Sequence, residues 1–259
     1  MRLSSVEKQF SKHSSFYDQN ADLQKKAANT LIDIINPEII ISDEPILEIG
    51  CGTGLFSEKL AGKFYENKII FTDISEKMLS ICRTKITDQF PESKNFSFKI
   101  LDAEKINSSS EFSLIVSGFA FQWFFNIKSS LKKIINALTP GGFLIFSLPV
   151  AGSFPEWEKA CRTLGLHFPE NQLPGIKEIE SVCSKGLSLN IFQNSVKIQF
   201  PSSLDFFRSL KKIGASYTKD GSRMSASDFK KLIRHLDRTS PEPFQITYKI
   251  AFIKMQKTQ

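Results

Sequence analysis

Short apolar runs alternate with amphipathic stretches along the chain from Pro45 to about Val150. The runs are rich in β-branched and aromatic residues, as strands are, and the stretches between them have helical spacing. This alternation predicts βαβ units around a mainly parallel sheet, and therefore an α/β fold. The expected strands are Ile46–Ile49, Ile69–Thr72, Phe96–Leu101, Phe112–Ser117 and Phe143–Leu148.

Three helices are predicted between these strands, at Gly54–Lys63, Ser75–Thr87 and Lys128–Leu138. Ser75 can open the second as an N-cap, because its hydroxyl can accept a hydrogen bond from the first turn. We expect Pro140-Gly141-Gly142 to end the third, since proline cannot continue a helix and glycine readily ends one.

The pattern changes after Val150, where short helical stretches replace the regular alternation. A final run behind Pro241 and Pro243 alternates only in part. We expect it to close a seven-stranded, mostly parallel sheet as an antiparallel last strand. The helices are expected at Pro155–Leu166, Ile176–Lys185, Ser202–Ile213 and Ser225–Arg238, and the two strands at Leu187–Phe200 and Phe244–Lys254.

The N-terminal segment, up to about Pro37, also has a helical pattern and could lie over the active edge of the sheet. The chain has no internal repeat, low-complexity tract or Gly/Ser linker, so we expect a single domain. Its parts would be an N-terminal helical lid (1–40), a core (41–150), a cap of helices with the sixth strand (151–240) and a closing strand (241–259). The apolar residues of the lid are spaced for one face: Phe10, Phe16, Tyr17, Leu23, Ala27 and Leu31.

The composition is that of a folded globular chain, since 41% of the 259 residues are hydrophobic and 24% are charged. These values exclude a disordered or collagen-like chain. The longest apolar stretches, Leu114–Ile127 and Gly141–Phe154, are shorter than the roughly 20 residues that cross a bilayer. Residues 1–20 lack the apolar centre of a secretory signal. We therefore expect a cytoplasmic protein.

Charge adds a hint about partners. Lys and Arg exceed Asp and Glu by seven, which favours an acidic partner without identifying it. The basic residues are dispersed and no aromatic platform can be placed, so nucleic acid is not expected. A membrane is not expected either, because the apolar stretches are too short to cross one. The four cysteines form no C-x-x-C pair and only three histidines could join them, so no metal site is expected.

The most informative segment is Leu47-Glu48-Ile49-Gly50-Cys51-Gly52-Thr53-Gly54-Leu55, in which an apolar strand ends in three glycines. Glycines there let the backbone turn sharply and approach a ligand, with the N–H groups of the next helix facing it. The G-x-G-x-G spacing is neither the dinucleotide fingerprint nor a P-loop. Asp73 ends the second strand about 20 positions on, where a carboxylate can accept both hydroxyls of a ribose.

These segments resemble the class I S-adenosylmethionine-dependent methyltransferases. Glu48–Gly54 is similar to their first motif, Phe71–Ser75 with Met78-Leu79 to their second, and Leu101–Glu104 to their third. Leu114–Ser117 and Leu138–Gly142 fit the next strand and the turn before strand five. The resemblance implies a Rossmann-like fold with S-adenosylmethionine as co-substrate and no metal. It implies donor contacts from Glu48, Gly50, Cys51, Gly52, Gly54, Asp73, Ile74, Met78, Asp102, Ala103, Glu104 and Ser117.

The resemblance also implies roles within this set. Glu48 and the glycine backbone would face the amino-acid end of the donor, and Asp73 its ribose. Asp102 would accept from the adenine amino group, with Ala103 contributing its backbone.

A closer resemblance, to the malonyl-acyl-carrier-protein O-methyltransferases of biotin biosynthesis, covers nearly the whole chain. It implies that the acceptor is the free carboxylate of a malonyl thioester on an acidic acyl carrier protein, which becomes a methyl ester. The segments that carry it are Phe10-Ser11-Lys12, Tyr17–Gln24, Phe119–Trp123, Gly152–Glu156, Arg208 with Ser209–Ala215, and Ile246-Thr247-Tyr248.

Acceptor residues follow from this resemblance. A carboxylate is ionised at neutral pH and needs no base, but it needs a fixed direction. We expect Arg208 to hold it, with Lys211 or Lys212 as less specific candidates, and Tyr17 to donate a hydrogen bond. Phe119 and Trp123 are expected to line the substrate side of the pocket, although Trp123 could equally anchor the helix that follows. A basic rim for the carrier protein would comprise Lys211, Lys212, Lys230, Lys231, Arg234 and Arg238.

Other activities remain open at this stage. The acceptor could be another small carboxylate, a phenol or a quinone-ring carbon, because the donor motifs concern only the binding of the cofactor and do not identify the acceptor. The chain could also be a non-catalytic S-adenosylmethionine-binding assembly factor. Methylation of nucleobase amines is disfavoured, since Ser117-Gly118-Phe119-Ala120 stands where those enzymes have an (Asn/Asp/Ser)-Pro-Pro-(Tyr/Phe) turn.

Overall fold

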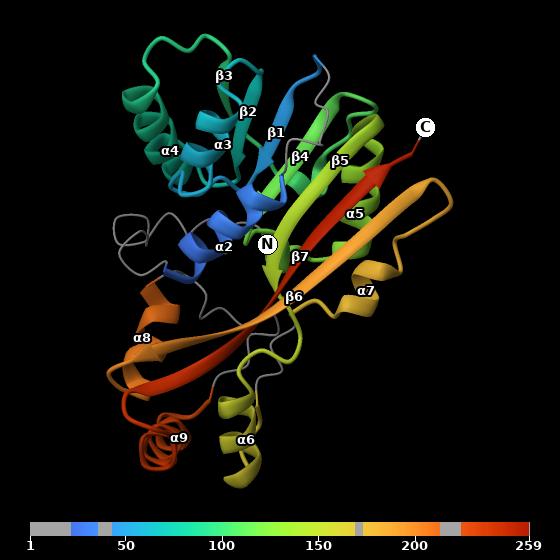
Figure 1. The fold of residues 1–259 in the computed structure, drawn as a ribbon. Helices are drawn as coiled ribbons and strands as arrows, with labels where there is room; N and C mark the ends of the chain where they lie inside the picture. The colour runs from blue at the N-terminus through green and yellow to red at the C-terminus, as the bar shows by residue number, and fades with distance from the viewer. Residues whose placement is uncertain (1–21, 36–42, 169–172, 213–223, 259) are drawn as a thin grey trace.

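A computed structural model describes residues 22–35, 43–168, 173–212 and 224–258. Seven strands form one sheet in the order β3-β2-β1-β4-β5-β7-β6, and β7 is antiparallel to both of its neighbours (Figure 1). This confirms the predicted seven-stranded sheet with an antiparallel last strand. The strands are β1 (Ile46–Ile49), β2 (Ile69–Asp73), β3 (Phe96–Ile100), β4 (Phe112–Gly118), β5 (Leu138–Pro149), β6 (Leu187–Phe200) and β7 (Phe244–Lys257).

Helices cover both faces of the sheet (Figure 1). One apolar cluster lies between the sheet and α2, α3 and α4, and another lies between the sheet and α5 and α7. The helices are α2 (Asp22–Ile34), α3 (Ser57–Lys63), α4 (Glu76–Gln89), α5 (Ile127–Asn136), α6 (Pro155–Thr163), α7 (Ile176–Glu180), α8 (Ser203–Lys212) and α9 (Ala226–Thr239), with 3₁₀ turns η3 (Ala103–Lys105) and η4 (Phe121–Trp123).

Strand order reverses between β1 and β4, so the connections from these two strands leave toward opposite faces of the sheet. Ligands of open α/β sheets bind at such a point, beyond the carboxyl ends of the strands. β1 is buried along its whole length, and Glu48 is its one polar residue. The functional site is therefore to be sought where β1 ends.

The expected helix boundaries are only partly right. Ser75 is the N-cap of α4, and its Oγ accepts a hydrogen bond from the Met78 N–H at 3.3 Å. The prediction that Pro140-Gly141-Gly142 ends the third helix is wrong, because α5 ends at Asn136 and this turn belongs to β5. Lys257 Nζ, from the far end of the chain, donates to Leu138 O at 2.6 Å where the helix meets the strand.

The hairpin of β6 and β7 is longer than the rest of the sheet. Its strands pair from Leu187 opposite Lys257 to Phe200 opposite Phe244, whereas β5 reaches β7 only as far as Ile250. The projecting half of the hairpin carries α6, α8 and α9, which together with it form the cap (Figure 1). β7 therefore belongs to both the sheet core and the cap.

Aromatic packing holds the cap together. Phe206 of α8 is fully buried, and its ring lies within 6.3 Å, centroid to centroid, of five other aromatic rings. The carboxylate of Glu156 in α6 accepts hydrogen bonds from the backbone N–H and the hydroxyl of Thr247 in β7. The five rings around Phe206 belong to Phe154, Trp157, Phe200, Phe207 and Phe244.

Phe206→Ala should lower the free energy of unfolding by about 3–5 kcal/mol, because it removes a buried ring and leaves a cavity in the cap. Phe192→Ala is the matched control, since Phe192 of β6 is 56% exposed and its loss should cost less than about 1 kcal/mol. Urea denaturation followed by circular dichroism measures both. Equal destabilisation by the two changes would contradict the assigned cap core.

Candidate functional site

The chain turns sharply after β1, through Gly50, Cys51 and Gly52, before α3. Gly50 and Gly52 have φ values of +71° and +55°, a region that L side chains rarely adopt. A Cβ on Gly50 would lie 2.5 Å from the Cβ of Ala120, whereas one on Gly52 would meet nothing within 4 Å. Gly50 is therefore required for close packing against the segment after β4, and Gly52 borders open space.

Asp73, at the end of β2, holds this turn in place. Its Oδ2 accepts a hydrogen bond from the Gly52 N–H at 2.9 Å, and its Oδ1 accepts one from the Ser75 N–H at 2.7 Å. Burial raises the pKa of Asp73 to about 6, against the opposing effect of these backbone donors. The carboxylate is thus ionised at neutral pH and keeps lone pairs for a ligand hydroxyl.

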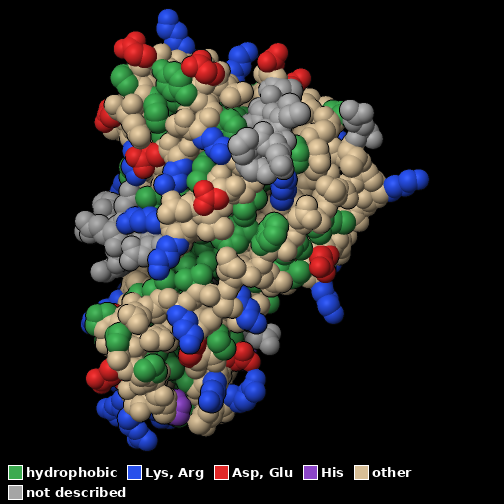
Figure 2. All heavy atoms as spheres, in the orientation of Figure 1, with side chains coloured by type: hydrophobic (Ala, Val, Ile, Leu, Met, Phe, Trp, Pro, Cys, Tyr) green, Lys and Arg blue, Asp and Glu red, His purple; other side chains and the backbone are tan. Residues whose placement is uncertain are grey.

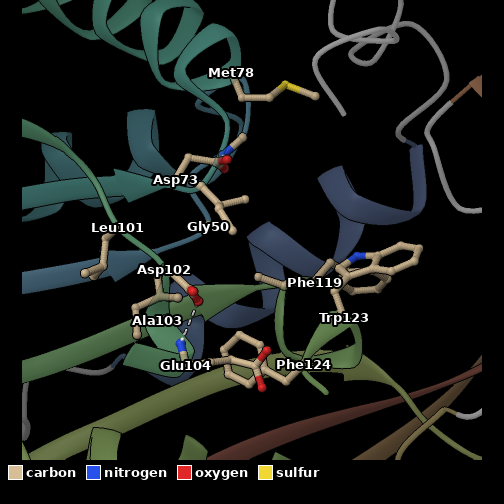
Figure 3. Close-up of a pocket in the computed structure, with 14 residues that line it drawn as sticks. Gly50, Asp73, Met78, Leu101, Asp102, Ala103, Glu104, Phe119, Trp123 and Phe124 are labelled. Atoms are coloured by element: carbon tan, nitrogen blue, oxygen red, sulfur yellow. Dashed lines mark hydrogen bonds between the residues drawn. The ribbon is translucent and has the colours of Figure 1, made fainter. Parts of the chain in front are cut away.

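A first cavity opens beside Asp73 and encloses about 710 Å³, including its mouth. Figure 3 shows Asp73 and Met78 on one side of it and Trp123 and Phe124 on the other. The Oδ1 of Asp102 accepts a hydrogen bond from the Glu104 N–H at 3.1 Å, which fixes η3 at the cavity wall. The remaining lining residues are Ile49, Gly50, Gly52, Ile74, Leu101, Ala103, Glu104, Phe119 and Ala120.

Glu104 lines this cavity, but its carboxylate also has a structural task. The Oε1 atom accepts hydrogen bonds from the backbone N–H groups of Phe125 and Asn126, at 2.9 and 3.2 Å, and from the hydroxyl of Ser130. These donors lie at the start of α5. Glu104 thereby fixes the η4–α5 segment that carries Trp123 and Phe124.

Phe119 borders both this cavity and a second one, as Gly50 also does. Its φ is +56°, which is rare for a bulky side chain. Two hydrogen bonds hold this conformation: the Phe119 N–H donates to Ser147 O at 2.9 Å, and Gln122 Nε2 donates to Phe119 O at 2.7 Å. The sequence had singled out Phe119 without any sign of this strained backbone.

The second cavity, of about 350 Å³, lies between α2 and the ends of β1, β4 and β5. Two buried polar atoms in its lining, Glu48 Oε2 and Ser147 Oγ, have no hydrogen-bond partner among the described residues. Burial raises the pKa of Glu48 to about 8, so the carboxyl group is mostly neutral at pH 7 in the empty site. The other lining residues are Gln24, Ala27, Ala28, Gly50, Cys51, Leu55, Phe56, Gly118 and Phe119.

Comparison with known proteins identifies the family. Residues 46–142 match a family described as a methyltransferase domain. A malonyl-[acyl-carrier protein] O-methyltransferase from Priestia megaterium is 30% identical, with 98% of this chain and 97% of that protein covered. The chain belongs to this O-methyltransferase family. Its methyl donor is therefore S-adenosylmethionine, as the motifs implied.

Two further comparisons agree. A protein of the same name from Acetivibrio thermocellus is 31% identical over 96% of this chain and 92% of its own length. The crystal structure of the YcgJ protein from Bacillus subtilis is 17% identical, covers 90% of this chain and 99% of its own, and has a TM-score of 0.63. At that identity the likeness shows the fold alone, which is Rossmann-like.

Two of the expected donor contacts line neither cavity of this methyltransferase. A Cβ on Gly54 would lie 3.3 Å from Cys82 Sγ, so Gly54 allows the turn to pack against α4. Ser117 is fully buried in β4 and its hydroxyl donates to Ile49 O at 2.8 Å, which ties β4 to β1. Both residues therefore stabilise the turn and the strands next to the cavities without lining the cavities themselves.

The expected acceptor residues are more scattered in the methyltransferase. Arg208 lies on the exposed side of α8, outside both cavities, and its Nη1 is 3.3 Å from Asp205 Oδ1. Lys211 is exposed one turn on. Tyr17 and the side chain of Lys212 lie outside the described residues. Phe119 and Trp123, by contrast, both line the first cavity.

Several lining residues of the methyltransferase site were not foreseen, notably Gln24 and Ser147. Gln24 lies in a segment already matched to relatives by its sequence, so that signal could have identified it. Ser147 is one hydroxyl near the end of an apolar strand, and nothing local distinguishes it from Ser113 or Ser117.

Within the described ranges, no three His, Cys, Asp or Glu side chains are grouped as metal ligands would be. In the same part of the chain, no helix is both long and apolar enough to span a bilayer.

Gly50→Ala should weaken binding of S-adenosylhomocysteine, the demethylated donor, by at least about tenfold, because the added methyl group must displace Ala120 and the turn with it. Isothermal titration calorimetry measures the affinity. Gly141→Ala is the matched control: Gly141 has a φ of +80° and open space around its Cβ position, so it adds similar backbone strain away from the site. Parent-like affinity of the Gly50 variant would contradict the assigned close packing.

Proposed function

We propose that the protein transfers the methyl group of S-adenosylmethionine to the free carboxylate of malonyl-acyl carrier protein, in the cytoplasm, giving the methyl ester that primes pimeloyl synthesis for biotin. The observation that carries this proposal is the length of the similarity. Relatives with this named activity match 96–98% of the chain, well beyond residues 46–142, so the cap is included.

The lining residues fit the donor part by part. Asp73, Leu101, Asp102 and Phe124 all line the first cavity. In the proposed arrangement Asp73 accepts from the ribose hydroxyls, and Asp102 accepts from the adenine amino group. Gly52 leaves room beside the turn. Glu48 lines the second cavity, and its Oε2 has no hydrogen-bond partner among the described residues, which supports a role for it at the amino-acid end of the donor.

The reaction requires little acid–base catalysis from the protein. The donor supplies a methyl carbon already activated by positively charged sulfur, which the acceptor oxygen attacks as the carbon–sulfur bond breaks. A carboxylate with a pKa of about 4 is ionised at neutral pH, so no general base is required. The contribution of the chain is to orient the two reactants and exclude water, to which Phe119 and Trp123 are suited by their place at the first cavity.

Cations that could guide an acidic acceptor lie on the cap. Arg208 and Lys211 are exposed on α8, and Arg208 is our candidate for holding the malonyl carboxylate, together with Tyr17 from the N-terminal segment. Figure 2 shows Lys and Arg side chains over the lower part of the molecule, where the cap lies. The exposed basic residues of α9 are Lys230, Lys231, Arg234 and Arg238, which we propose as the rim for the carrier protein together with Lys211 and Lys212.

Incubation with methyl-labelled donor and malonyl-, succinyl- or acetyl-carrier protein tests the activity directly. We expect label on the malonyl form alone, in a linkage that mild base releases as an ester should. Label on a phenol or quinone in a parallel panel, with none on the malonyl form, would favour the alternative acceptors. Donor binding without transfer to any acceptor would favour a non-catalytic role.

Arg208→Ala should lower kcat/KM for the malonyl acceptor by about tenfold or more, because a charge-assisted hydrogen bond to the carboxylate is lost. The affinity for S-adenosylhomocysteine should stay within about twofold, since Arg208 lines neither donor cavity. Arg162→Ala is the control, because Arg162 is an exposed cap arginine with a comparable ion pair to Glu158. Equal kcat/KM values for the two variants would remove the assignment of Arg208.

A further inference from the structure

Glu48 is the one carboxyl group that lines the second cavity among the described residues. It is 1% exposed, and its Oε2 has no hydrogen-bond partner there. Its side chain hydrogen-bonds to Ser57 of α3. A carboxylate buried with a free oxygen is costly, so this geometry suits the protonated form while the cavity is empty.

The groups around Glu48 reinforce that state. From β2 it faces Asp73, whose negative charge opposes a second one. The thiol of Cys51, itself in contact with the Cys82 thiol of α4, is un-ionised because burial raises its pKa well above the ordinary value. The polar side chains that α2 and β5 contribute to the lining are those of Gln24 and Ser147, and both are neutral. No Lys, Arg or His lines either cavity in the described part of the chain.

We propose that Glu48 loses its proton to solvent when the donor binds, so that loading of the methyl donor is coupled to proton release. The inference rests on the proposed function, which places the amino-acid end of the donor in the second cavity. That end carries an ammonium group, and Glu48 is the unpartnered acid available to it. The carboxylate then pairs with the ammonium, and no other bond is made or broken.

The size of the effect favours release over retention. An opposite charge within about 4–6 Å lowers the pKa of a carboxyl group by roughly 1–3 units. From about 8 in the empty site, such a shift takes the pKa of Glu48 to 7 or below. A neutral Glu48 could instead donate a hydrogen bond to the carboxylate of the donor, but the ammonium would then have no anionic partner from the lining of the second cavity.

The coupling predicts a direction for the pH dependence. Below the pKa of the empty site, binding requires a proton to leave, so donor affinity should rise by up to about tenfold per pH unit from pH 6 toward pH 8. Asp73, with a pKa of about 6, contributes only at the acid end of this range. The α-amino group of the donor loses its own proton near pH 8, which limits the range on the other side.

Isothermal titration calorimetry at pH 7 in phosphate, HEPES and Tris buffers measures the protons released, because these buffers differ in ionisation enthalpy. S-adenosylhomocysteine is the first ligand, since it keeps the ammonium group and cannot react. 5′-Methylthioadenosine is the second, since it lacks the amino-acid end. We expect the parent protein to release between about half a proton and one proton with the first ligand and none with the second.

Glu48→Gln should abolish the release and flatten the pH dependence of the affinity for S-adenosylhomocysteine, while affinity for 5′-methylthioadenosine stays within about twofold. Glu66→Gln is the matched control, because Glu66 is an exposed glutamate within the core segment (41–150). This variant should behave as the parent protein does. Should the Glu48 variant fail to fold, the two ligands compared on the parent protein still decide the question.

Each other outcome overturns the proposal in its own way. Tight binding of S-adenosylhomocysteine without proton release would show that Glu48 stays neutral and donates to the ligand. Release that persists in the Glu48 variant would assign the proton to another group. Failure of both ligands to bind would remove the donor assignment itself, which is a different failure from the first two.

Discussion

The hydrogen bond from the Gly52 N–H to Asp73 Oδ2 fixes the position of the turn after β1 relative to the end of β2. Two neighbouring contacts depend on the same alignment: the Cys51 N–H donates to Thr72 O at 2.8 Å, and the Thr72 hydroxyl donates to Glu48 O at 2.6 Å. Without them the glycine turn could not lie flat against the strand ends. The carboxylate that orders the turn is also the one that we propose for the ribose hydroxyls, so the same atoms would serve both the fold and the donor.

Residues that pack around this turn form walls of the two cavities. Gly50 allows Ala120 to come close, and Phe119, with its strained backbone, lines both cavities. Strain of this kind persists only where neighbours impose it, and here the hydrogen bonds from Phe119 to Ser147 and from Gln122 do so. The walls of the two cavities are thus pre-formed by the sheet core.

Local signals predicted much of this arrangement. β1 and β6 have the boundaries that their apolar patterns indicate. Gly50, Gly52 and Asp73 could be identified as lining residues because their spacing along the sequence is typical of a binding site. The sequence did not show that β5 begins at Leu138, because a register irregularity beside Phe112 and the distant Lys257 decide it.

Residues placed by the overall topology were harder to foresee. Ser147 reaches the site only because β5 lies beside β4, and the position of Arg208 relative to the cavities depends on where the projecting hairpin holds α8. Burial of Phe206 and Leu210 on one side of α8 explains why Arg208 lies on the exposed side. Helical periodicity could indicate that side, but not its distance from the glycine turn.

The acidic and the basic residues of the proposed site lie in different parts of the molecule. Glu48, Asp73 and Asp102 line the donor cavities, while the cations proposed for the acceptor are on the cap. The donor carries a sulfonium and an ammonium against one carboxylate, so its net charge is positive and an acidic lining favours it. Transfer removes the sulfonium charge, which weakens this attraction for the product. An acidic lining would also repel the malonyl carboxylate that we propose as the acceptor, which is why we assign its binding to the cations of the cap.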